Sequence, residues 1–444
     1  MKLTEIASLF PHSFSDFPDI EFTGVCIDSR KVKTNELFVA IRGERLDGHD
    51  FILDAEKLGA AAVLCEHAVA DVVIPQLIVP NTCDALATIA TYHRQKINCF
   101  VIALTGSNGK TSVKEMIASI LPQPSFATPG NLNNHLGVPL SVMQLQPHHR
   151  FAAFELGASH LGEIAYTVAI VQPKVTLINN IAPAHIAGFG SIEGVARAKG
   201  EIYQGLLEGG TAVVNDDDAY AHFWDDILKT HHVVRFSINK STDVCARDIV
   251  MNPLGCAQFS LITPLGQAAV QLNVPGRHNV SNALAAAACC YAAGIELADI
   301  VTGLERFSGV AGRMMFKVGK NKSTIIDDTY NANLRSALTA VDVLAERHGL
   351  RILVLGDMGE LGEWTEQHHQ EIGRAARQHG IDVVMTCGEH SANTSLIFGD
   401  EGKHYESQSL LVRDLVNYLD AQTTVLVKGS RSSAMEKIVN ELIG

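Results

Sequence analysis

Short apolar runs alternate with amphipathic stretches along most of the chain. Near the N-terminus, the apolar runs at 36–41 and 61–66 predict strands, and residues 51–60 predict a helix that ends at Gly59. A longer amphipathic stretch at 84–97 predicts a helix that leads into the next part of the chain. These segments indicate a small α/β unit at the N-terminus.

The middle of the chain carries continuous apolar runs of the kind that a parallel sheet buries on both faces. Such runs lie at residues 100–104, 151–157, 174–181 and 210–216. Between about 235 and 275 the apolar and polar positions alternate, which predicts a small antiparallel sheet. A helix is predicted to begin near Asn279.

A third unit repeats the strand–helix pattern toward the C-terminus. Its apolar runs lie at residues 323–330, 351–357, 382–388 and 423–429. We therefore expect an α/β protein with three domains, at residues 1–82, 83–312 and 313–444. The central domain is expected to hold a parallel sheet with a phosphate-binding loop, and the C-terminal one to be Rossmann-like.

Composition narrows the class of protein. The 444 residues are 47% hydrophobic and carry a formal net charge of −13, which disfavours a nonspecific nucleic-acid binder. The nine cysteines include no C-x-x-C pair, so we expect reduced thiols and a cytoplasmic protein. No signal peptide is expected, and no apolar run is long enough to span a membrane.

The most informative segment is TGSNGKTS, residues 105–112. The usual phosphate loop has a glycine five positions before Gly109, where this chain has Leu104. The segment still follows a predicted strand and opens a predicted helix, so backbone N–H groups could face an anion. Lys110 would reach phosphates and Thr111 would offer its hydroxyl to Mg²⁺. The alternative is an ordinary strand–helix turn.

With this segment, the nucleotide-binding residues are expected to be Thr105, Gly106, Ser107, Asn108, Gly109, Lys110, Thr111 and Ser112. Further motifs follow at residues 130–142, 154–164, 179–202, 276–286, 309–314, 327–338, 355–363 and 425–436. Their sequences and their order resemble the Mur ligase family over essentially the whole chain. Members of this family are ATP-dependent amide ligases of cell-wall precursor synthesis.

The resemblance implies a reaction in which ATP phosphorylates a carboxylate and an amine then attacks the acyl phosphate. It assigns catalytic roles to Lys110, Glu155, His185 and Lys199, and magnesium binding to Thr111, Glu155, His185 and Lys199. In the family this lysine is carbamylated, which requires a neutral amine and hence a lowered pKa. From the residues alone, Glu155 could be a strand-end acid, His185 a structural hydrogen bonder and Lys199 an unmodified lysine. Mg²⁺ also prefers oxygen to histidine nitrogen.

The resemblance also implies binding residues. For ATP they are Asn282, with His278 near it, and Arg313, Asp328 and Tyr330. Substrate contacts are expected in the N-terminal UDP-binding part from Ser29, Arg30, Asp47, Gly48 and His49. Near the γ-phosphate, substrate contacts are expected from Asn131, Asn133 and Asn134, with Thr128 nearby. In the third unit they are expected from Asp357, Lys428 and Arg431. Glu360 and Gly362 follow Asp357 in the same motif. Each group could instead form only turns, caps or surface charges.

Two positions depart from the family pattern. Asn35 stands where relatives usually have glycine, and asparagine tolerates the left-handed conformation. Leu334 stands where relatives usually have proline, so the following helix lacks a fixed first-turn φ. Neither change removes a catalytic group.

The resemblance implies a ligase, expected to be monomeric, whose small-molecule substrates are UDP-MurNAc-tripeptide and D-Ala-D-Ala, with ATP and Mg²⁺ as cofactors. The ligase that adds the preceding peptide residue is a weaker alternative, because its relatives carry a D-N-P-R motif that this chain lacks. Folylpolyglutamate synthase lacks the N-terminal motifs. A non-catalytic sugar-nucleotide regulator would have no use for a metal constellation.

Overall fold

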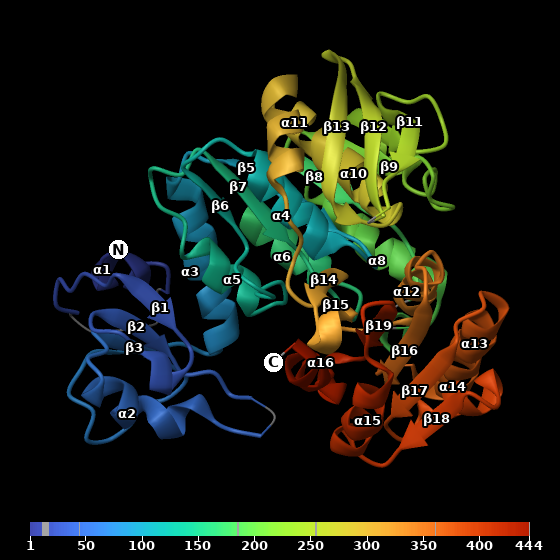
Figure 1. Ribbon diagram of the computed structural model, residues 1–444. Helices are drawn as coiled ribbons and strands as arrows, with labels where there is room; N and C mark the ends of the chain where they lie inside the picture. The colour runs from blue at the N-terminus through green and yellow to red at the C-terminus, as the bar shows by residue number, and fades with distance from the viewer. Residues whose placement is uncertain (11–16, 44, 184–185, 254, 360, 444) are drawn as a thin grey trace.

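The computed structural model describes residues 1–10, 17–43, 45–183, 186–253, 255–359 and 361–443. In this part of the chain, three β-sheets follow one another along the sequence. The N-terminal unit and the third unit lie on opposite sides below the central one in the view of Figure 1. The α/β class and the three-unit organisation are confirmed, and the boundaries at 82 and 313 stay a prediction.

The first sheet is parallel, in the order β1-β2-β3-β4. Its strands are β1 (Gly24–Cys26), β2 (Glu36–Val39), β3 (Ala62–Cys65) and β4 (Gln76–Ile78). The helical segments of this unit are α1 (Leu3–Ala7), η1 (Ser29–Lys31), η2 (Gly48–Phe51) and α2 (Ile52–Lys57). Asn35 has φ 67°, so asparagine takes the left-handed conformation expected of it just before β2.

The second sheet follows the long helix α3 (Thr82–Lys96) and has the order β13-β12-β11-β10-β9-β8-β5-β7-β6 in the described residues. Its first five strands in the chain are β5 (Phe100–Thr105), β6 (Ser125–Ala127), β7 (Phe151–Glu155), β8 (Val175–Ile178) and β9 (Thr211–Asn215). The remaining strands are β10 (His232–Ser237), β11 (Val244–Met251), β12 (Cys256–Thr263) and β13 (Gly266–Pro275). The short edge strand β6 was not predicted.

The antiparallel pairing predicted near 235–275 is present, but it forms part of the central sheet. Strands β11, β12 and β13 are antiparallel to one another, but β11 pairs in parallel with β10 through Phe236↔Val244 and Ser237↔Cys245. The hairpin therefore extends the central sheet. Pairing satisfies the edge of β10, which would otherwise expose its backbone groups.

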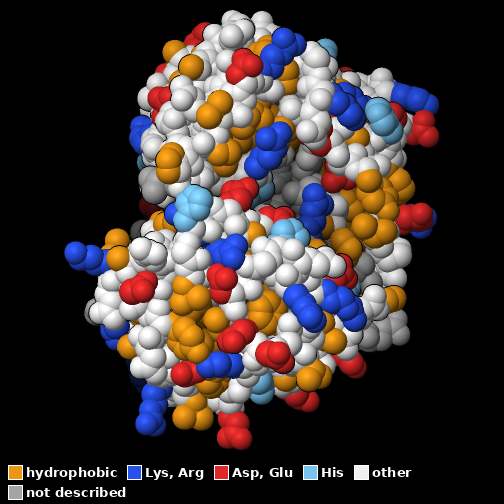
Figure 2. Space-filling view, turned by 45° about the vertical axis from the view of Figure 1, so that its right-hand side comes forward, with side chains coloured by type: hydrophobic (Ala, Val, Ile, Leu, Met, Phe, Trp, Pro, Cys, Tyr) orange, Lys and Arg blue, Asp and Glu red, His pale blue; other side chains and the backbone are white. Residues whose placement is uncertain are grey.

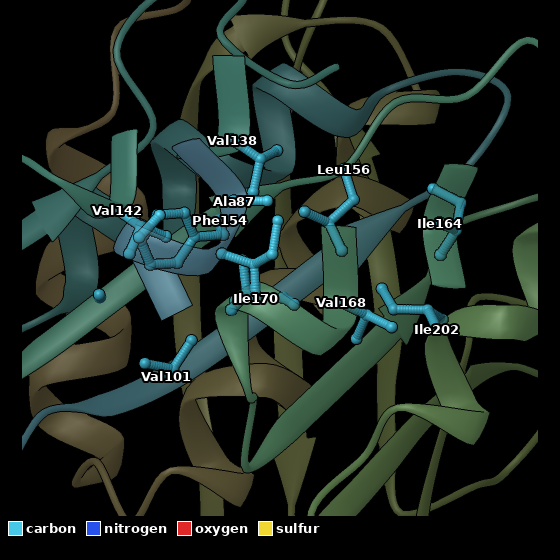
Figure 3. Packing of buried hydrophobic residues seen from close by; sticks show 14 of the residues in the cluster. Ala87, Val101, Val138, Val142, Phe154, Leu156, Ile164, Val168, Ile170 and Ile202 are labelled. Carbon is cyan, nitrogen blue, oxygen red and sulfur yellow. The ribbon is translucent and has the colours of Figure 1, made fainter. Parts of the chain in front are cut away.

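Helices cover both faces of the central sheet. One face carries α3, α5 (Gly137–Val142), α6 (Glu163–Val171) and α8 (Ile192–Gln204), and the other carries α4 (Lys110–Ile120), α10 (His278–Ala292) and α11 (Leu297–Arg306). Val101 and Ala103 of β5 pack in the first core, whereas Ile102 and Leu104 pack in the second. Figure 3 shows side chains of the first core, which extends from Val101 of β5 past Phe154 of β7 and Ile170 of α6 to Ile202 of α8. Burial on both faces explains the continuous apolar runs of the sequence.

The third sheet has the order β14-β15-β19-β16-β17-β18 and is parallel except for its edge strand β14. Its strands are β14 (Met315–Val318), β15 (Thr324–Asp328), β16 (Leu350–Gly356), β17 (Val383–Cys387), β18 (Gly402–Tyr405) and β19 (Thr423–Lys428). Its longer helices are α12 (Leu334–Ala345), α13 (Thr365–Gln378), α14 (Ala392–Phe398), α15 (Gln408–Leu415) and α16 (Glu436–Ile443). Among the described residues, no helix is long and apolar enough to cross a bilayer.

Candidate active site

The phosphate loop connects the end of β5 to the start of α4, as predicted. Gly109 has φ 77° and directly precedes the helix, a conformation that glycine adopts without strain. A Cβ atom there would lie 2.5 Å from Oδ1 of Asn282. Position 109 therefore requires glycine, because its φ is positive and because Asn282 leaves no room for a Cβ atom. The first N–H groups of α4 have no intrahelical partners, and helix N-termini of this kind favour anion binding.

Lys110 lies against the loop that precedes it. Its Nζ donates to the carbonyl oxygens of Gly106 at 2.7 Å and Ser107 at 3.3 Å. Burial lowers the pKa of Lys110, and the negative charge of Glu155 opposes that shift. A cation is thus held at the helix N-terminus, where a phosphate chain would bind.

Thr111 and Glu155 meet behind the loop. The Thr111 hydroxyl donates to Oε2 of Glu155 at 2.8 Å, and Asn133 Nδ2 donates to Oε1 at 2.7 Å. Arg313 Nη2 also donates to Thr111 Oγ1, at 2.7 Å. The carboxylate and hydroxyl are the oxygen donors that Mg²⁺ prefers, so these two predicted ligands do come together. The backbone N–H of Glu155 donates to Thr128, which fixes the strand end.

Lys199 lies on α8 and lines the same cavity as Lys110. Only 2% of its surface is exposed. Burial, and to a lesser extent the positive charge of Lys110, hold the pKa of Lys199 well below its usual value of 10.5. From the sequence alone, a lysine on this helix would normally be a solvated charge, whereas Lys199 is buried. His185, the remaining predicted ligand, lies outside the described residues, and so does Glu360.

The third unit contributes side chains to this site. The guanidinium of Arg313 lies 4.1 Å from the ring centre of Tyr330. Lys428 is 2% exposed and donates to Asp328 Oδ2 at 2.6 Å and to the carbonyl oxygen of Asn331 at 2.9 Å. Burial lowers the pKa of the neighbouring His278. Asp328 and Lys428, expected to bind a ribose and a carboxylate, therefore neutralise each other in this structure.

A cavity of about 770 Å³ joins these groups between the second and third units. Figure 2 shows the hollow between the upper and lower parts of the molecule. The predicted site residues that line it are Gly106, Ser107, Asn108, Gly109, Lys110, Ser112, Asn131, Asn133, Asn134, Glu155, Lys199, Asn282, Arg313, Asp328, Tyr330 and Lys428. Thr105 and Thr111 are buried directly behind this lining. Asn134 also caps α5, with Oδ1 accepting from Gly137 N at 2.8 Å.

Asp357 and Arg431 do not line this cavity. Oδ1 of Asp357 accepts the backbone N–H groups of His390 at 3.0 Å and Ser391 at 2.7 Å. Arg431 is 68% exposed and pairs with Glu436 at 3.2 Å. Gly362 begins η4 (Gly362–Trp364), which follows β16 in the chain. Asp357 therefore ties loops of the third sheet together, whereas Arg431 stays accessible.

The predicted UDP-binding residues lie in the N-terminal unit, where Asp47 and His49 contact each other and Arg30 is exposed. Asp47 Oδ1 accepts from His49 N at 3.0 Å and lies 2.6 Å from His49 Nδ1. These contacts lower the pKa of Asp47 to about 2, the backbone N–H of His49 contributing most. A Cβ atom on Gly48 would lie 2.6 Å from the backbone nitrogen of Ile41. Ser29 and Arg30 form η1, where Arg30 pairs with Asp28 and points outward, 85% exposed.

Sequence reasoning missed Asn179 and Asn180, which follow β8. Asn180 Oδ1 accepts the backbone N–H of Asn108 at 2.9 Å, and Asn179 Nδ2 donates to the carbonyl oxygen of Asn108 at 2.9 Å. Asn179 also donates to Oδ1 of Asn282 at 3.2 Å. The available signal was the pair of asparagines directly after an apolar strand, at the sheet edge where open α/β folds bind ligands.

Several buried polar atoms at the site lack a partner among the described residues. They are Thr105 Oγ1, Asn108 Nδ2, Asn179 Oδ1 and Arg313 Nε. Buried polar groups are normally paired, and unpaired ones next to a cavity are suited to a polar ligand. Of these residues, Asn108 and Arg313 line the cavity, and their N–H donors, with the loop and Lys110, fit a nucleotide phosphate chain. Thr111 and Glu155 fit a magnesium ion.

Comparisons with known proteins agree with this geometry. The family models of the Mur ligase family match in three parts: the catalytic domain at residues 21–94, the middle domain at 104–290 and the glutamate ligase domain at 312–431. The chain is 45% identical over 430 residues to the UDP-N-acetylmuramoyl-tripeptide–D-alanyl-D-alanine ligase of Escherichia coli. That match covers 96% of this chain and 94% of the relative.

Solved structures give the same result. MurF from Acinetobacter baumannii superposes with a TM-score of 0.92 at 37% identity, covering 99% of this chain and 98% of the other. MurF from Thermotoga maritima, solved in complex with ADP, has a TM-score of 0.83 at 25% identity, covering 96% and 98%. The chain belongs to the Mur ligase family.

Proposed function

We propose that this chain uses ATP to join D-alanyl-D-alanine to UDP-N-acetylmuramoyl-tripeptide. The observation that carries the proposal is the convergence of Lys110, Thr111, Glu155 and Arg313 on one phosphate loop. The near full-length similarity to ligases of that name supplies the substrates. We further propose a cytoplasmic monomer with domain boundaries near 82 and 313.

The reaction has two steps. A carboxylate oxygen of the tripeptide attacks the γ-phosphorus of ATP, the bond to the bridging oxygen breaks, and ADP leaves. The amine of the dipeptide then attacks the acyl carbon, loses a proton, and expels phosphate to leave an amide. Several anions meet in the first step, so fixed positive charge is the main requirement. Lys110, Arg313 and the N-terminus of α4 supply it in this chain.

Magnesium would be held by the Thr111 hydroxyl and the Glu155 carboxylate. When bound there, the ion supplies charge neutralisation for the phosphates. Asn133 orients the carboxylate from its other oxygen. We also propose that His185 contributes to metal binding.

Lys199 is proposed to carry a carbamate. Its neutral amine would attack the carbon of CO₂, form an N–C bond and release a proton, which leaves an anionic group. The burial of Lys199 and its lowered pKa support the neutral amine that this step needs. Carbon-13 NMR after addition of labelled bicarbonate tests the step: we expect a carbamate resonance that Lys199→Met abolishes. A resonance that survives in the variant would refute this assignment.

The remaining substrate contacts are proposed from where the residues lie in the fold. Asn131 and Asn134 line the cavity beside Asn133 and are proposed to face the tripeptide carboxylate. Asp357, Lys428 and Arg431 lie at strand ends of the third sheet and are proposed to serve the peptide ends. Ser29, Arg30, Asp47, Gly48 and His49 are proposed to shape the UDP site.

The test is ATP-dependent phosphate release by the purified protein with Mg²⁺. We expect release only when UDP-N-acetylmuramoyl-tripeptide and D-alanyl-D-alanine are both present. Release with the UDP-dipeptide precursor and a free amino acid would instead indicate the preceding ligase of the pathway. No release with any combination would overturn the proposed catalysis and favour a binding protein.

A further inference from the structure

The phosphate-loop residue Asn108 is held by two different units of the molecule. Its main chain is fixed from within the central unit: Asn180 accepts its N–H, and Asn179 and Asn180 donate to its carbonyl oxygen at 2.9 and 3.0 Å. Its side chain is held from the third unit, because Asn333 Nδ2 donates to Asn108 Oδ1 at 2.9 Å. A contact between units thus reaches the centre of the loop.

The orientation of Asn333 is fixed by the helix that it begins. Asn333 is the N-cap of α12, and its Oδ1 accepts the backbone N–H of Ser336 at 2.9 Å. The Ser336 hydroxyl accepts the N–H of Asn333 at 3.1 Å, which completes a capping box. Because the amide oxygen faces the helix, the amide nitrogen is left to donate outward. This cap also gives the helix a start without the proline that relatives have at Leu334.

The donor on Asn333 determines which way the amide of Asn108 faces. Asn108 must present its oxygen to an N–H donor, so its own Nδ2 is turned away from Asn333. That Nδ2 atom is buried and has no partner among the described residues, although Asn108 lines the cavity. If Asn108 reversed its amide, two N–H groups would oppose each other.

A second residue of the same helical turn strengthens the docking. Arg335 Nη1 donates to the carbonyl oxygen of Ile181 at 3.1 Å. The neighbouring Ala182 exchanges hydrogen bonds of 2.9 Å with the Ser107 hydroxyl through its N–H and its carbonyl oxygen. The first turn of α12 therefore contacts the phosphate loop directly and also contacts the segment that supports it.

We infer that Asn333 is a positioning residue that orients the side chain of Asn108 so that its Nδ2 donates to the phosphate chain of ATP. The inference rests on the proposed function only in that it requires ATP to bind at this loop. Asn108 touches the nucleotide, and Asn333 acts through Asn108. The third unit thereby contributes to nucleotide affinity from a residue that need not touch the nucleotide.

The test is a double-mutant cycle with Asn108→Ala and Asn333→Ser. Serine is a good N-cap, so the second change keeps α12 capped and neutral while removing the donor to Asn108. The matched control is Asn81→Ser, since Asn81 caps α3 in the same manner, accepting from Cys83 N at 2.8 Å. ATP affinity is measured by isothermal titration calorimetry, together with Tm and the KM and kcat of phosphate release.

We expect Asn108→Ala to weaken ATP binding about tenfold, the cost of one hydrogen bond to a charged group. Asn333→Ser is expected to weaken ATP binding severalfold while its Tm stays close to that of the wild type. The variant should raise KM for ATP more than it lowers kcat. In the Asn108→Ala background, Asn333→Ser should cause no further loss of ATP affinity. Asn81→Ser should leave ATP affinity unchanged. If Asn333→Ser lowers Tm, Asn333→Thr repeats the test with another capping residue.

Two results would overturn the inference. One is a wild-type ATP affinity in Asn333→Ser. The other is a double variant whose loss of ATP affinity equals the product of the losses in the two single variants. A wild-type protein that binds no ATP would instead refute the proposed function. The failures of the two proposals are therefore distinguishable.

Discussion

The phosphate loop and the Asp47–His49 turn are both short polar segments that adjoin a parallel sheet, yet their side chains are used in opposite ways. In the turn, the carboxylate of Asp47 contacts His49 and Arg42, and His49 Nε2 accepts the N–H of Glu66 at 2.8 Å. At the loop, Asn108 Nδ2 and Arg313 Nε lack partners among the described residues. The comparison separates polar groups that hold the fold from those that remain available to a ligand.

The same distinction divides the third unit. His369 is closed in by hydrogen bonds with Met358 and Thr365, whereas Arg313 and Tyr330 face the cavity. A substitution among the closed-in groups should therefore change stability first. A substitution among the available groups should change ligand binding or rate first.

The largest expected effect is the loss of turnover in Lys110→Ala. Removing one preorganised donor to a developing anion lowers kcat by about 10²–10³-fold, and more is expected here because a full charge is lost. Binding of the UDP substrate should change little, because its proposed site lies in the N-terminal unit. Phosphate release and calorimetry with the UDP substrate measure both quantities. A fully active Lys110→Ala enzyme would refute the role of the loop.

Gly48→Ala should show the opposite behaviour, with a large loss of stability. The added Cβ would lie 2.6 Å from Ile41 N and 2.8 Å from Ile41 O, and backbone atoms cannot rotate away as a side chain can. Overpacking of this kind costs about 1–3 kcal/mol of unfolding free energy. Urea denaturation measures the loss. Gly359→Ala is the control, because its nearest neighbour is Ser430 Cβ at 3.8 Å, and equal midpoints for the two variants would contradict the prediction.

These contrasts show what the sequence could and could not predict. Apolar runs located β5, β7, β8 and β9, because burial on both faces of a parallel sheet leaves a local signature. The phosphate loop was equally visible, since its strand, glycines and helix are contiguous. The left-handed conformation of Asn35 followed from residue type alone.

Contacts between residues that are far apart in the sequence were not predictable. Lys428 and Asp328 are one hundred residues apart, and nothing local indicates that they neutralise each other. The contact of Asn333 with Asn108 spans the boundary between units and depends on a helix cap. The antiparallel hairpin was recognised, but its attachment to β10 is a pairing between strands that local alternation does not encode.

A smaller effect is expected from acid, through the closed-in His369. Its Nε2 accepts the N–H of Met358 at 3.1 Å and its Nδ1 donates to the carbonyl oxygen of Thr365, 2.7 Å away, so the folded state requires the neutral ring. Burial lowers the pKa of His369 below 6.5. The unfolded chain therefore binds the proton more readily, and stability should fall as the pH drops below about 6.5.

His369→Gln tests this pH dependence, because glutamine can accept and donate without titrating. Unfolding free energies from urea denaturation at pH 7 and pH 5.5 should differ less in the variant than in the wild type. His379→Gln is the control, since the side chain of His379 is 45% exposed and pairs with Asp342 at the surface. An unchanged pH dependence in His369→Gln would show that other groups dominate the acid response.

The smallest effect on stability is expected for Arg431→Ala. Its guanidinium is 68% exposed and pairs across the surface with Glu436, and such pairs contribute about 0–1 kcal/mol. If Arg431 binds a peptide carboxylate, as proposed, KM for D-alanyl-D-alanine should nevertheless rise severalfold with ATP affinity unchanged. Lys57→Ala is the control, because Lys57 is 73% exposed, pairs with Asp54 and is assigned to no binding site. If Arg431→Ala keeps the wild-type KM for the dipeptide, Arg431 does not bind the dipeptide and is an ordinary surface charge. The acceptor would then have to be recognised by groups that line the cavity itself.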